Sequence, residues 1–168
     1  MWPGFDSRQP DMIKIIFLFI LVVILGVLLA GWHRTYKIQH SSTQGVFQLG
    51  TAPDPLPEGS YRGSVSGYHV AWQGKSFYSR EASGTNNFKT ADGSIVQKYP
   101  FRTYIASGLQ DRAITVLKID YNISKNPWWL RMVLDEIVQT EPGHYVGKIH
   151  VRLPLGISFA VGYFTLEK

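Results

Sequence analysis

The chain contains no cysteine, and this absence removes several classes of chemistry from consideration. Without thiols there is no disulfide, no thiolate zinc site, no iron–sulfur cluster and no cysteine nucleophile. Short motifs of common active sites are absent as well: the sequence has no HExxH, no GxSxG and no phosphate-cradling glycine loop. We therefore predict no metal site and no catalytic residue from motifs, and the residues indicate no particular cofactor.

Histidines are few, and their spacing argues against a metal site. His69, His144 and His150 are the histidines of the C-terminal region. His144 and His150 share one face of a predicted strand, but six residues along a strand separate them by about 20 Å. They cannot bind the same ion.

Clustered charge is also lacking. The formal net charge is +5, from 17 Lys and Arg against 12 Asp and Glu, but the basic residues occur singly. A nucleic-acid site needs basic residues interleaved with aromatic ones on one face, so we predict no nucleic-acid partner. The scattered charges fit a solubilising surface near a membrane.

One long apolar run is present. From Ile15 to Trp32 the chain carries no charge, and as a helix this run would span about 27 Å, close to the hydrocarbon thickness of a bilayer. Trp32 and Tyr36 are placed to lie at a membrane interface. We predict an uncleaved transmembrane anchor over residues 15–36, with the lipid bilayer contacted by residues 15–32. A cleaved signal peptide is the alternative, disfavoured because the run is long and no small-residue cleavage site follows cleanly.

The flanking charges leave the orientation of this run nearly undecided. Arg8 and Lys14 precede it, and Arg34 and Lys37 follow it, so the rule that basic residues stay in the cytoplasm gives almost a tie. A short N-terminal tail, residues 1–14, before a larger domain is the common signal-anchor layout. We expect a single-pass protein of the bacterial inner membrane with its C-terminal domain on the periplasmic side.

Residues 37–58 have the composition of a linker. QHSSTQG is small and polar, which predicts a flexible tether, and Pro53, Pro55 and Pro57 follow in TAPDPLPEG. Proline fixes φ and favours an extended chain. The second piece should therefore be a stiff entry into a domain that covers residues 59–168.

That domain is predicted to be mainly β. In TVLKIDYNI, Leu117, Ile119 and Tyr121 alternate with Lys118 and Asp120, as expected of a strand with one buried face. HYVGKIHVRL alternates in the same way, and further strands are predicted in GSYRGSVSGYHVAWQGKSFYS, KYPFRTYIAS and ISFAVGYFTLE. About six to eight such strands indicate a small antiparallel barrel or a strongly curved half-barrel.

Turn and bend signals support a curved sheet. Asp92-Gly93 predicts a hairpin turn, and Pro100 suggests an edge or a bulge. Aromatic residues alternate with glycine in several strands, for example Tyr145 with Gly147. Glycine lets a sheet bend and leaves room for a neighbouring ring.

One segment, NPWWLRMVLDEIV, is predicted to be an amphipathic helix. Asn126 can cap its first turn, and Pro127 suits the first helical position. Apolar residues then recur at the spacing of one helix face: Leu130, Val133, Leu134, Ile137 and Val138. Such a helix would cover the barrel mouth or the open side of the sheet.

The other side chains of this segment allow several roles. Asp135 and Glu136 would point about 100° apart on a helix, so we do not expect them to act together as acid and base. Trp128 and Arg131 are candidates for a partner-binding or lid surface. Trp129 either extends the apolar stripe or lines a ligand site.

A group of short motifs resembles a known type of family. AWQGKSF, KYPF, LKIDYN, NPWWLRMVLDEIV, PGHYVGK and GYF follow one another over roughly residues 61–166. They resemble small bacterial proteins of unassigned function related to the GXWXG and adjoining domain-of-unknown-function families, which are similar to the calycin (lipocalin-like) barrels. Here GSYRG stands where a GxWxG would be clearer, and no catalytic assignment is carried over.

This resemblance implies a lipocalin-like barrel with an apolar interior, and a lipid or another hydrophobic small molecule as its ligand. The residues it singles out combine aromatic walls with one side chain able to contact an anion. These ligand-binding candidates are Trp72, Lys75, Phe101, Tyr121 and Trp129.

Three hypotheses on function follow. We expect a non-enzymatic, membrane-anchored domain that binds a lipid or other apolar small molecule at the membrane surface. The first alternative is an accessory or structural subunit of a larger membrane protein complex, which would have a filled barrel and an exposed apolar patch. The second is an enzyme acting on a lipid or isoprenoid, with Lys118, Asp120 or Tyr121 in an interior site where titratable groups converge.

Overall fold

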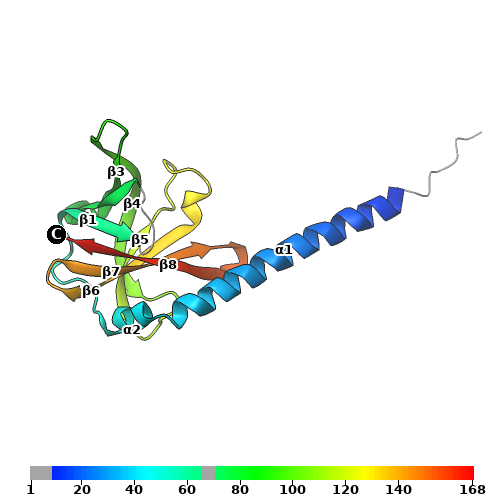
Figure 1. The fold of residues 1–168 in the computed structure, drawn as a ribbon, viewed down its shortest axis with the longest axis horizontal. Helices are drawn as coiled ribbons and strands as arrows, with labels where there is room; N and C mark the ends of the chain where they lie inside the picture. The colour runs from blue at the N-terminus through cyan, green and yellow to red at the C-terminus, as the bar shows by residue number, and fades with distance from the viewer. Residues whose placement is uncertain (1–8, 66–70) are drawn as a thin grey trace, which may run out of the picture.

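The chain forms a closed β-barrel from which one long helix projects (Figure 1). The structure, a computed structural model, describes residues 9–65 and 71–168, so His69 lies outside the described residues. The helices are α1 (Gln9–Gln39) and α2 (Ser42–Leu49), and three 3₁₀ turns are η1 (Ser79–Glu81), η2 (Leu130–Met132) and η3 (Pro154–Gly156). The strands are β1 (Gly59–Val65), β2 (Trp72–Tyr78), β3 (Ser83–Lys89), β4 (Ile95–Ser107), β5 (Thr115–Asp120), β6 (Val133–Glu141), β7 (His144–Arg152) and β8 (Ser158–Glu167).

The barrel has a simple up-and-down topology. Each strand pairs antiparallel with the next, and β1 pairs with β8 to close the sheet. The predicted fold class, mainly β with an antiparallel barrel behind an apolar helix, is confirmed. Because antiparallel strands alternate in direction, the β3–β4, β5–β6 and β7–β8 connections lie at one end of the barrel, together with the last residues of β1. We call this end the mouth end.

Two local predictions about the sheet are confirmed. Gly93 has φ +88° in the β3–β4 hairpin turn, where Asp92 Oδ1 accepts a hydrogen bond from Ser94 N at 3.1 Å. Pro100 follows Tyr99 in a bulge of β4, where two residues replace one of β3 in the ladder. A bulge accommodates proline because the residue there donates no ladder hydrogen bond.

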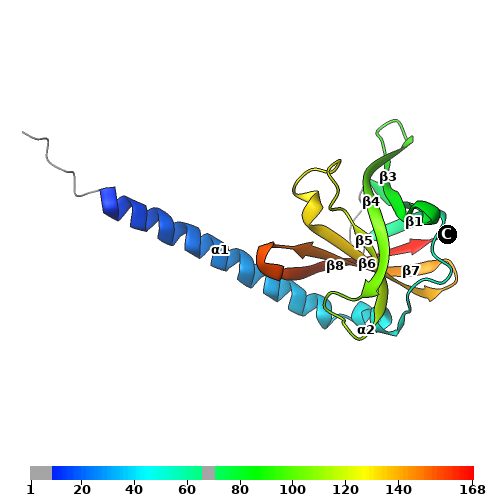
Figure 2. The ribbon, with the colours of Figure 1, turned by 180° about the vertical axis from the view of Figure 1, so that it is seen from behind.

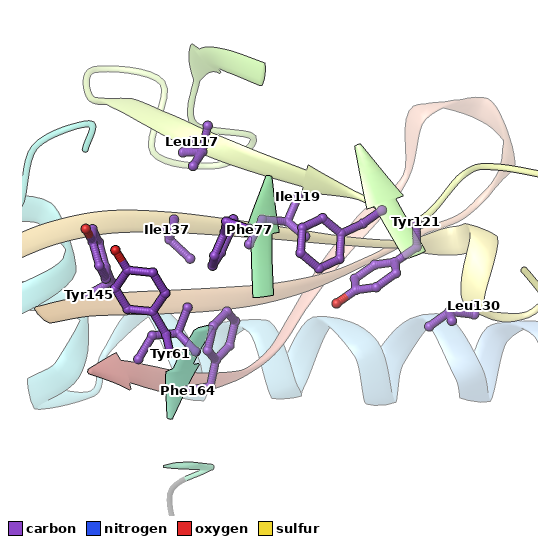
Figure 3. Close-up of a cluster of buried hydrophobic side chains, with 11 residues drawn as sticks. Tyr61, Phe77, Leu117, Ile119, Tyr121, Leu130, Ile137, Tyr145 and Phe164 are labelled. Atoms are coloured by element: carbon purple, nitrogen blue, oxygen red, sulfur yellow. The ribbon is translucent and has the colours of Figure 1, made fainter. Parts of the chain in front are cut away.

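A row of aromatic rings fills the interior of the barrel, from the end away from the mouth at Tyr61 toward the mouth end at Tyr121. Tyr61, Phe77, Phe101 and Tyr121 follow one another edge to face, with ring centroids 5.7, 5.6 and 5.7 Å apart. Figure 3 shows Tyr61 at one end of this core and Tyr121 and Leu130 at the other, with α1 running alongside. Edge-to-face contacts of this kind add to the stability that burial alone gives.

Glycine makes room for two further aromatic rings, those of Phe164 and Trp72, as predicted. A Cβ on Gly147 would lie 2.1 Å from the Phe164 ring, and one on Gly63 would lie 2.3 Å from the Trp72 ring. Both distances are far shorter than a van der Waals contact, so only glycine fits beside these rings without a shift of the backbone.

The helix predicted over residues 126–138 is wrong. Its first residues form a loop, Leu130–Met132 form the turn η2, and Val133–Glu141 form strand β6. β6 pairs with β5 and β7 and is buried on both faces. A strand covered on both faces loses its alternation and takes on an apolar pattern that resembles a helix stripe. Asn126 caps no helix; its Nδ2 donates to the carbonyl oxygens of Pro100 and Tyr121.

The region predicted to be a flexible tether is also different. α1 continues to Gln39, and the polar residues that follow form α2. Phe47 of α2 is fully buried among residues that point outward from the barrel wall, including Val138 and Tyr163. The burial of one large ring fixes α2 on the barrel, although its sequence is otherwise polar.

The last turns of α1 pack against β8. Gly31 meets the Phe159 ring, Arg34 Nε donates to Val161 O at 2.8 Å, and Ala160 N donates to Thr35 Oγ1 at 3.0 Å. Before these turns the helix is exposed, and residues 11–39 are long and apolar enough to cross a membrane, with a mean hydropathy of 3.2 over the most apolar stretch. Figure 2, from behind, shows the same helix leaving the barrel along β8.

Candidate functional site

A cavity of about 350 Å³ opens into the barrel at the mouth end. Its walls are contributed by residues at the mouth-end halves of the strands and by the β5–β6 connection. They are mostly apolar: Val65, Trp72, Phe88, Tyr99, Trp129, Leu130, Val133, Ile149 and Phe164. The cavity has the size and the apolar lining typical of small-molecule sites.

Four polar residues meet at the floor of this cavity. Lys75 Nζ lies 2.9 Å from Asp135 Oδ2 and 3.0 Å from Asn86 Oδ1, and it also donates to the Tyr121 hydroxyl oxygen. Tyr121 in turn donates to Asp135 Oδ2 at 3.3 Å or to Asn86 Oδ1 at 3.1 Å. All three protons of the ammonium group therefore have partners within the protein.

Burial sets the protonation of this floor. It lowers the pKa of the Lys75 ammonium, and the charge and hydrogen bond of Asp135 oppose that shift. Burial also raises the pKa of the Tyr121 hydroxyl well above its ordinary value, and the Asp135 charge adds to this shift. Tyr121 therefore keeps its proton, and a carboxylate paired with the lysine leaves the floor without net charge.

Aromatic rings surround the lysine head group. Lys75 Nζ lies within 5.5 Å of the ring centroids of Trp72, Phe101, Tyr121 and Phe164. These are cation–π distances, and such contacts are stronger where water is excluded. The rings provide some of the stabilisation that the buried ammonium loses with its water.

The predicted ligand-binding residues are brought together with one exception. Trp72, Lys75, Tyr121 and Trp129 line the cavity, from β2, the end of β5 and the β5–β6 connection. Phe101 does not line it; its ring is fully buried behind Tyr121, with centroids 5.7 Å apart. Whether these residues bind a ligand stays a prediction.

Two residues of the floor were missed at the sequence level. Asn86 gave no signal in a polar stretch of β3. The helix prediction placed Asp135 beside Glu136 and in reach of Arg131 on an outer face. In strand β6, Asp135 instead points into the barrel and Glu136 points outward. Lys75 and Asp135 are sixty positions apart in the sequence, so no local pattern pairs them. The pair becomes apparent only once the register of the closed sheet is known.

Trp128 and Arg131 lie in and beside the loop that enters β6, not on a helix. Trp128 is 74% exposed, and Arg131 Nε donates to Asn122 Oδ1 at 3.2 Å. Trp129 is half-exposed and packs edge to face on Tyr99. Of these side chains, Trp129 lines the cavity. The predicted α-helix does not form here, because a loop leads into the turn η2 and β6 begins at Val133.

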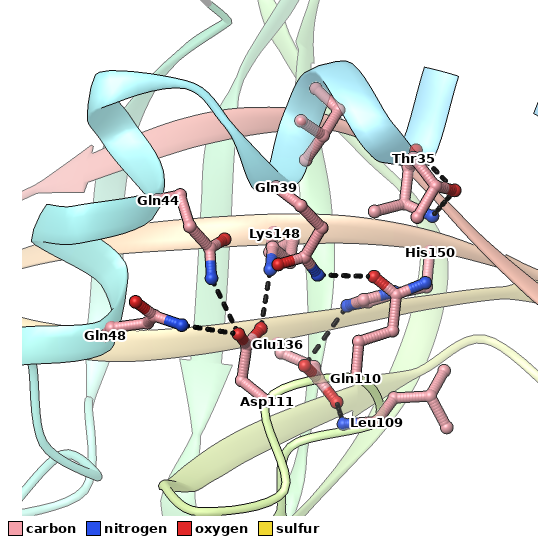
Figure 4. Close-up of polar contacts among 12 residues, drawn as sticks. Thr35, Gln39, Gln44, Gln48, Leu109, Gln110, Asp111, Glu136, Lys148 and His150 are labelled. Atoms are coloured by element: carbon pink, nitrogen blue, oxygen red, sulfur yellow. Dashed lines mark hydrogen bonds and ion pairs between the residues drawn. The ribbon is translucent and has the colours of Figure 1, made fainter. Parts of the chain in front are cut away.

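A second polar cluster lies outside the barrel wall, beneath α2 and the β4–β5 connection (Figure 4). Glu136 accepts hydrogen bonds from Lys118, from Leu109 N at 2.6 Å and from His150 Nε2 at 3.1 Å. Burial opposes its ionisation, but the hydrogen bond and charge of His150, followed by those of Lys118, hold the pKa of Glu136 below its ordinary value. Lys148 forms a neighbouring buried pair with Asp111 at 2.5 Å.

This placement corrects the interior site of the enzyme hypothesis. Lys118 bonds to Glu136 outside the barrel, and Asp120 pairs with Arg152 at 2.6 Å. Of the three residues proposed for that site, Tyr121 alone points into the cavity. Strand alternation is the reason, because neighbours in a strand face opposite sides.

The anchor residues predicted for the membrane interface border a further cavity. Trp32 and Tyr36 are exposed on α1 and line a cleft of about 630 Å³ together with Arg112 and the β7–β8 turn. Their position at a membrane interface stays a prediction.

Within residues 9–65 and 71–168 no group of three or more His, Asp or Glu side chains is arranged to hold a metal ion. Comparison of the chain with protein-family models, curated proteins and solved structures finds no match.

Proposed function

We propose that this chain is a single-pass membrane protein whose barrel binds one chain of a lipid or isoprenoid in the mouth-end cavity. The observation that carries the proposal is an apolar cavity of about 350 Å³ in a barrel that is otherwise filled by its own side chains. An accessory subunit with a purely structural barrel has no use for this space, so the cavity favours the binding hypothesis.

Cavity size restricts the class of ligand. At about 30 Å³ for each atom-sized group, a volume of about 350 Å³ holds on the order of a dozen carbon atoms. A single acyl or isoprenoid chain fits this volume, whereas a lipid with two full acyl chains does not. We therefore propose a single-chain ligand, or one chain of a larger lipid.

The floor restricts the orientation of the ligand. The sequence suggested that Lys75 contacts an anion, but Asp135 already occupies that position at 2.9 Å. A charged head group would have to break this pair, at a cost that buried charges make high. The ligand thus enters with its apolar end, and its polar group stays at the mouth.

The packing of α1 supports a retained anchor. Cleavage directly after Trp32 would remove Gly31, which packs on the Phe159 ring of β8. Cleavage a few residues later would also remove Arg34 and Thr35, whose side chains bond to the backbone of β8. A signal peptide does not share hydrogen bonds with the mature domain. We propose the bacterial inner membrane, with the barrel on the periplasmic side, as the location of this anchor.

Photo-crosslinking tests the binding site. The full-length chain in lipid nanodiscs is irradiated with a single-chain fatty acid that carries a terminal diazirine, and the labelled residues are mapped by mass spectrometry. We expect labels on Ile149, which pairs with Asp135 of the cavity floor, and on Val133, two residues nearer the mouth. Val133→Phe, which fills part of the cavity, should abolish them, while Val46→Phe on the exposed face of α2 should not. Equal labelling in both variants would reject this cavity as the site.

Chemistry on the bound molecule is a second candidate function. It is favoured by the convergence of Lys75, Asp135 and Tyr121 in one apolar pocket, where the pKa of Lys75 is lowered and that of Tyr121 is raised. Tyr121→Phe separates the two candidates: it should leave crosslinking intact in a binding protein, whereas an enzyme would accumulate unreacted ligand that mass spectrometry detects.

A further inference from the structure

The cavity opens on the side of the barrel from which α1 projects. Its mouth is formed in part by Trp129 and Leu130 of the β5–β6 connection. The β7–β8 turn belongs to the same end, and its residues Gly156 and Ile157 line a cleft together with Trp32 of α1. Figure 1 shows the β7–β8 turn beside α1 and the β5–β6 connection on the same side of the barrel. The exposed part of α1 extends from there away from the barrel.

The length of α1 determines how close this end comes to a bilayer. The charge-free run ends at Trp32, but α1 is exposed on all sides only as far as Val27, and Leu28 and Gly31 are already partly covered. From Ile15 to Val27 the helix rises about 20 Å, less than the hydrocarbon thickness of about 30 Å. A helix that spans the bilayer without a large mismatch must therefore bring its covered turns, and the β7–β8 turn beside them, into the interface.

The tips of the mouth end carry the side chains that a bilayer interface favours. Leu155 in the β7–β8 turn is 97% exposed, and Trp128 in the β5–β6 connection is 74% exposed. Tryptophan prefers the head-group region of a membrane. Large apolar residues exposed in two separate connections at the same end of the barrel are otherwise unfavourable in water.

Charge near the β5–β6 and β7–β8 connections has the sign that attracts anionic head groups. Lys125 and Arg131 are exposed in the β5–β6 connection, and Arg112 is exposed in the cleft between α1 and the β7–β8 turn. The carboxylates of the same segments are engaged in ion pairs, Asp111 with Lys148 and Asp120 with Arg152. Basic residues next to a membrane-inserted apolar surface strengthen binding to anionic lipids.

We propose that the mouth end docks on the bilayer that α1 spans, with Leu155 and Trp128 in the interface, and that the cavity is loaded directly from that bilayer. The ligand part of this inference rests on the proposed function, and the docking part does not. A chain that enters from the membrane moves from lipid into the apolar cavity without crossing water, with its polar group left at head-group depth. This path agrees with a cavity floor that is already neutralised.

Spin labelling measures the docking without a ligand. Because the chain has no cysteine, Leu155→Cys, Trp128→Cys and the control Glu141→Cys, at the end of β6 away from the mouth, can each be labelled with a nitroxide at one position. The full-length protein is placed in nanodiscs of phosphatidylcholine with a minor share of phosphatidylglycerol. We expect collision with oxygen to exceed collision with a water-soluble nickel chelate at the two mouth positions, and the reverse at Glu141→Cys.

The outcomes separate the two proposals. Mouth labels that behave like the control overturn docking, even if the fatty acid crosslinks in the cavity. Spin–spin broadening between chains would place a second copy there and also overturn it. Mouth labels at membrane depth without cavity crosslinks support docking and reject the binding function.

A charge at the tip tests loading. Leu155→Asp should lower the crosslinking yield at a fixed fatty-acid content by about tenfold, since burial of one leucine contributes about this factor to an equilibrium constant. Leu56→Asp, at an exposed leucine that lines no part of the mouth-end cavity, should leave the yield unchanged. Equal yields in both variants would overturn loading from the bilayer.

Discussion

Replacement of Lys75 by methionine should destabilise the barrel strongly, because it leaves a buried carboxylate without its partner. The Lys75 and Asp135 side chains are 3% and 6% exposed and 2.9 Å apart. After Lys75→Met, the Asp135 carboxylate keeps one hydrogen bond, from Tyr121 at 3.3 Å. Breaking one half of a buried ion pair costs about 3–5 kcal/mol.

A second estimate gives the same size and adds a pH signature. The stranded carboxylate can avoid its charge by binding a proton, and protonating a carboxyl group with an ordinary pKa of about 3.9 costs about 4 kcal/mol at pH 7. A proton bound only in the folded variant stabilises it as the pH falls. The difference from the wild type should therefore shrink by about 1.4 kcal/mol for each pH unit between pH 7 and pH 5.

Guanidinium unfolding of the full-length protein in detergent, followed by tryptophan fluorescence, measures this difference. The double variant Lys75→Met/Asp135→Leu should recover to within about 1–2 kcal/mol of the wild type, because an apolar pair of similar volume replaces the ionic one. The reasoning is refuted if the single variant loses less than about 1 kcal/mol at pH 7. It is equally refuted if the double variant is as unstable as the single one.

Three further predictions concern packing and the outer polar cluster. Gly31→Ala should lower the free energy of unfolding by about 1–3 kcal/mol, because its Cβ would lie 2.7 Å from a phenylalanine ring of β8. The control Gly26→Ala, with no atom within 4 Å, should not lower it. Equal thermal midpoints of the two variants would contradict the packing of α1. Gly147→Ala should destabilise the barrel by about 1–3 kcal/mol as well, because its Cβ meets a ring at 2.1 Å. Gly162→Ala should be nearly neutral in the same melts, because its Cβ meets nothing within 4 Å. The opposite order of stabilities would be inconsistent with the register of β7 and β8. Folding lowers the pKa of Glu136 from its ordinary value of 4.5, so the stability that its carboxylate contributes is present above that pH and is lost as the pH falls. When the urea midpoint is followed into acid, Glu136→Gln should therefore lose less stability than the wild type. Parallel curves would argue against a lowered pKa of Glu136.

Much of the barrel could be predicted from local patterns. The alternation of Leu117, Ile119 and Tyr121 with polar neighbours identifies β5, and these three side chains do point into the barrel. Asp92-Gly93 marks the hairpin of β3 and β4. Such signals are readable because each depends on a few consecutive residues and on one physical rule, either strand alternation or the backbone freedom of glycine.

The sequence-based predictions are wrong where segments distant in the chain bury a surface that a local pattern would leave exposed. β6 is covered inside by the barrel core and outside by α2 and the β4–β5 connection, so its apolar residues do not alternate. Glu136, Lys118 and Lys148 are buried beneath that cover, which their own sequence segments do not indicate. α2 was missed because a single buried ring, Phe47, holds an otherwise polar segment.

The candidate site could be predicted in part for the same reason. Trp72, Lys75 and Tyr121 were chosen as an aromatic wall with one cation, and closure of the sheet brings them to one cavity. The charge balance of the floor was not predictable, because Asp135 meets Lys75 only through barrel closure. That missing carboxylate changes the expected ligand from an anion held by lysine to an apolar chain above a neutral floor.

Native mass spectrometry of the full-length protein, released gently from its own membrane, tests the central claim most directly. The account predicts one retained small molecule per chain, with a single acyl or isoprenoid chain and a mass on the order of a few hundred daltons. Val133→Phe should lose it, and Val46→Phe should keep it. A bare chain in the wild type, or release with protein subunits at fixed stoichiometry and no small molecule, would contradict the claim that the barrel is a binding site.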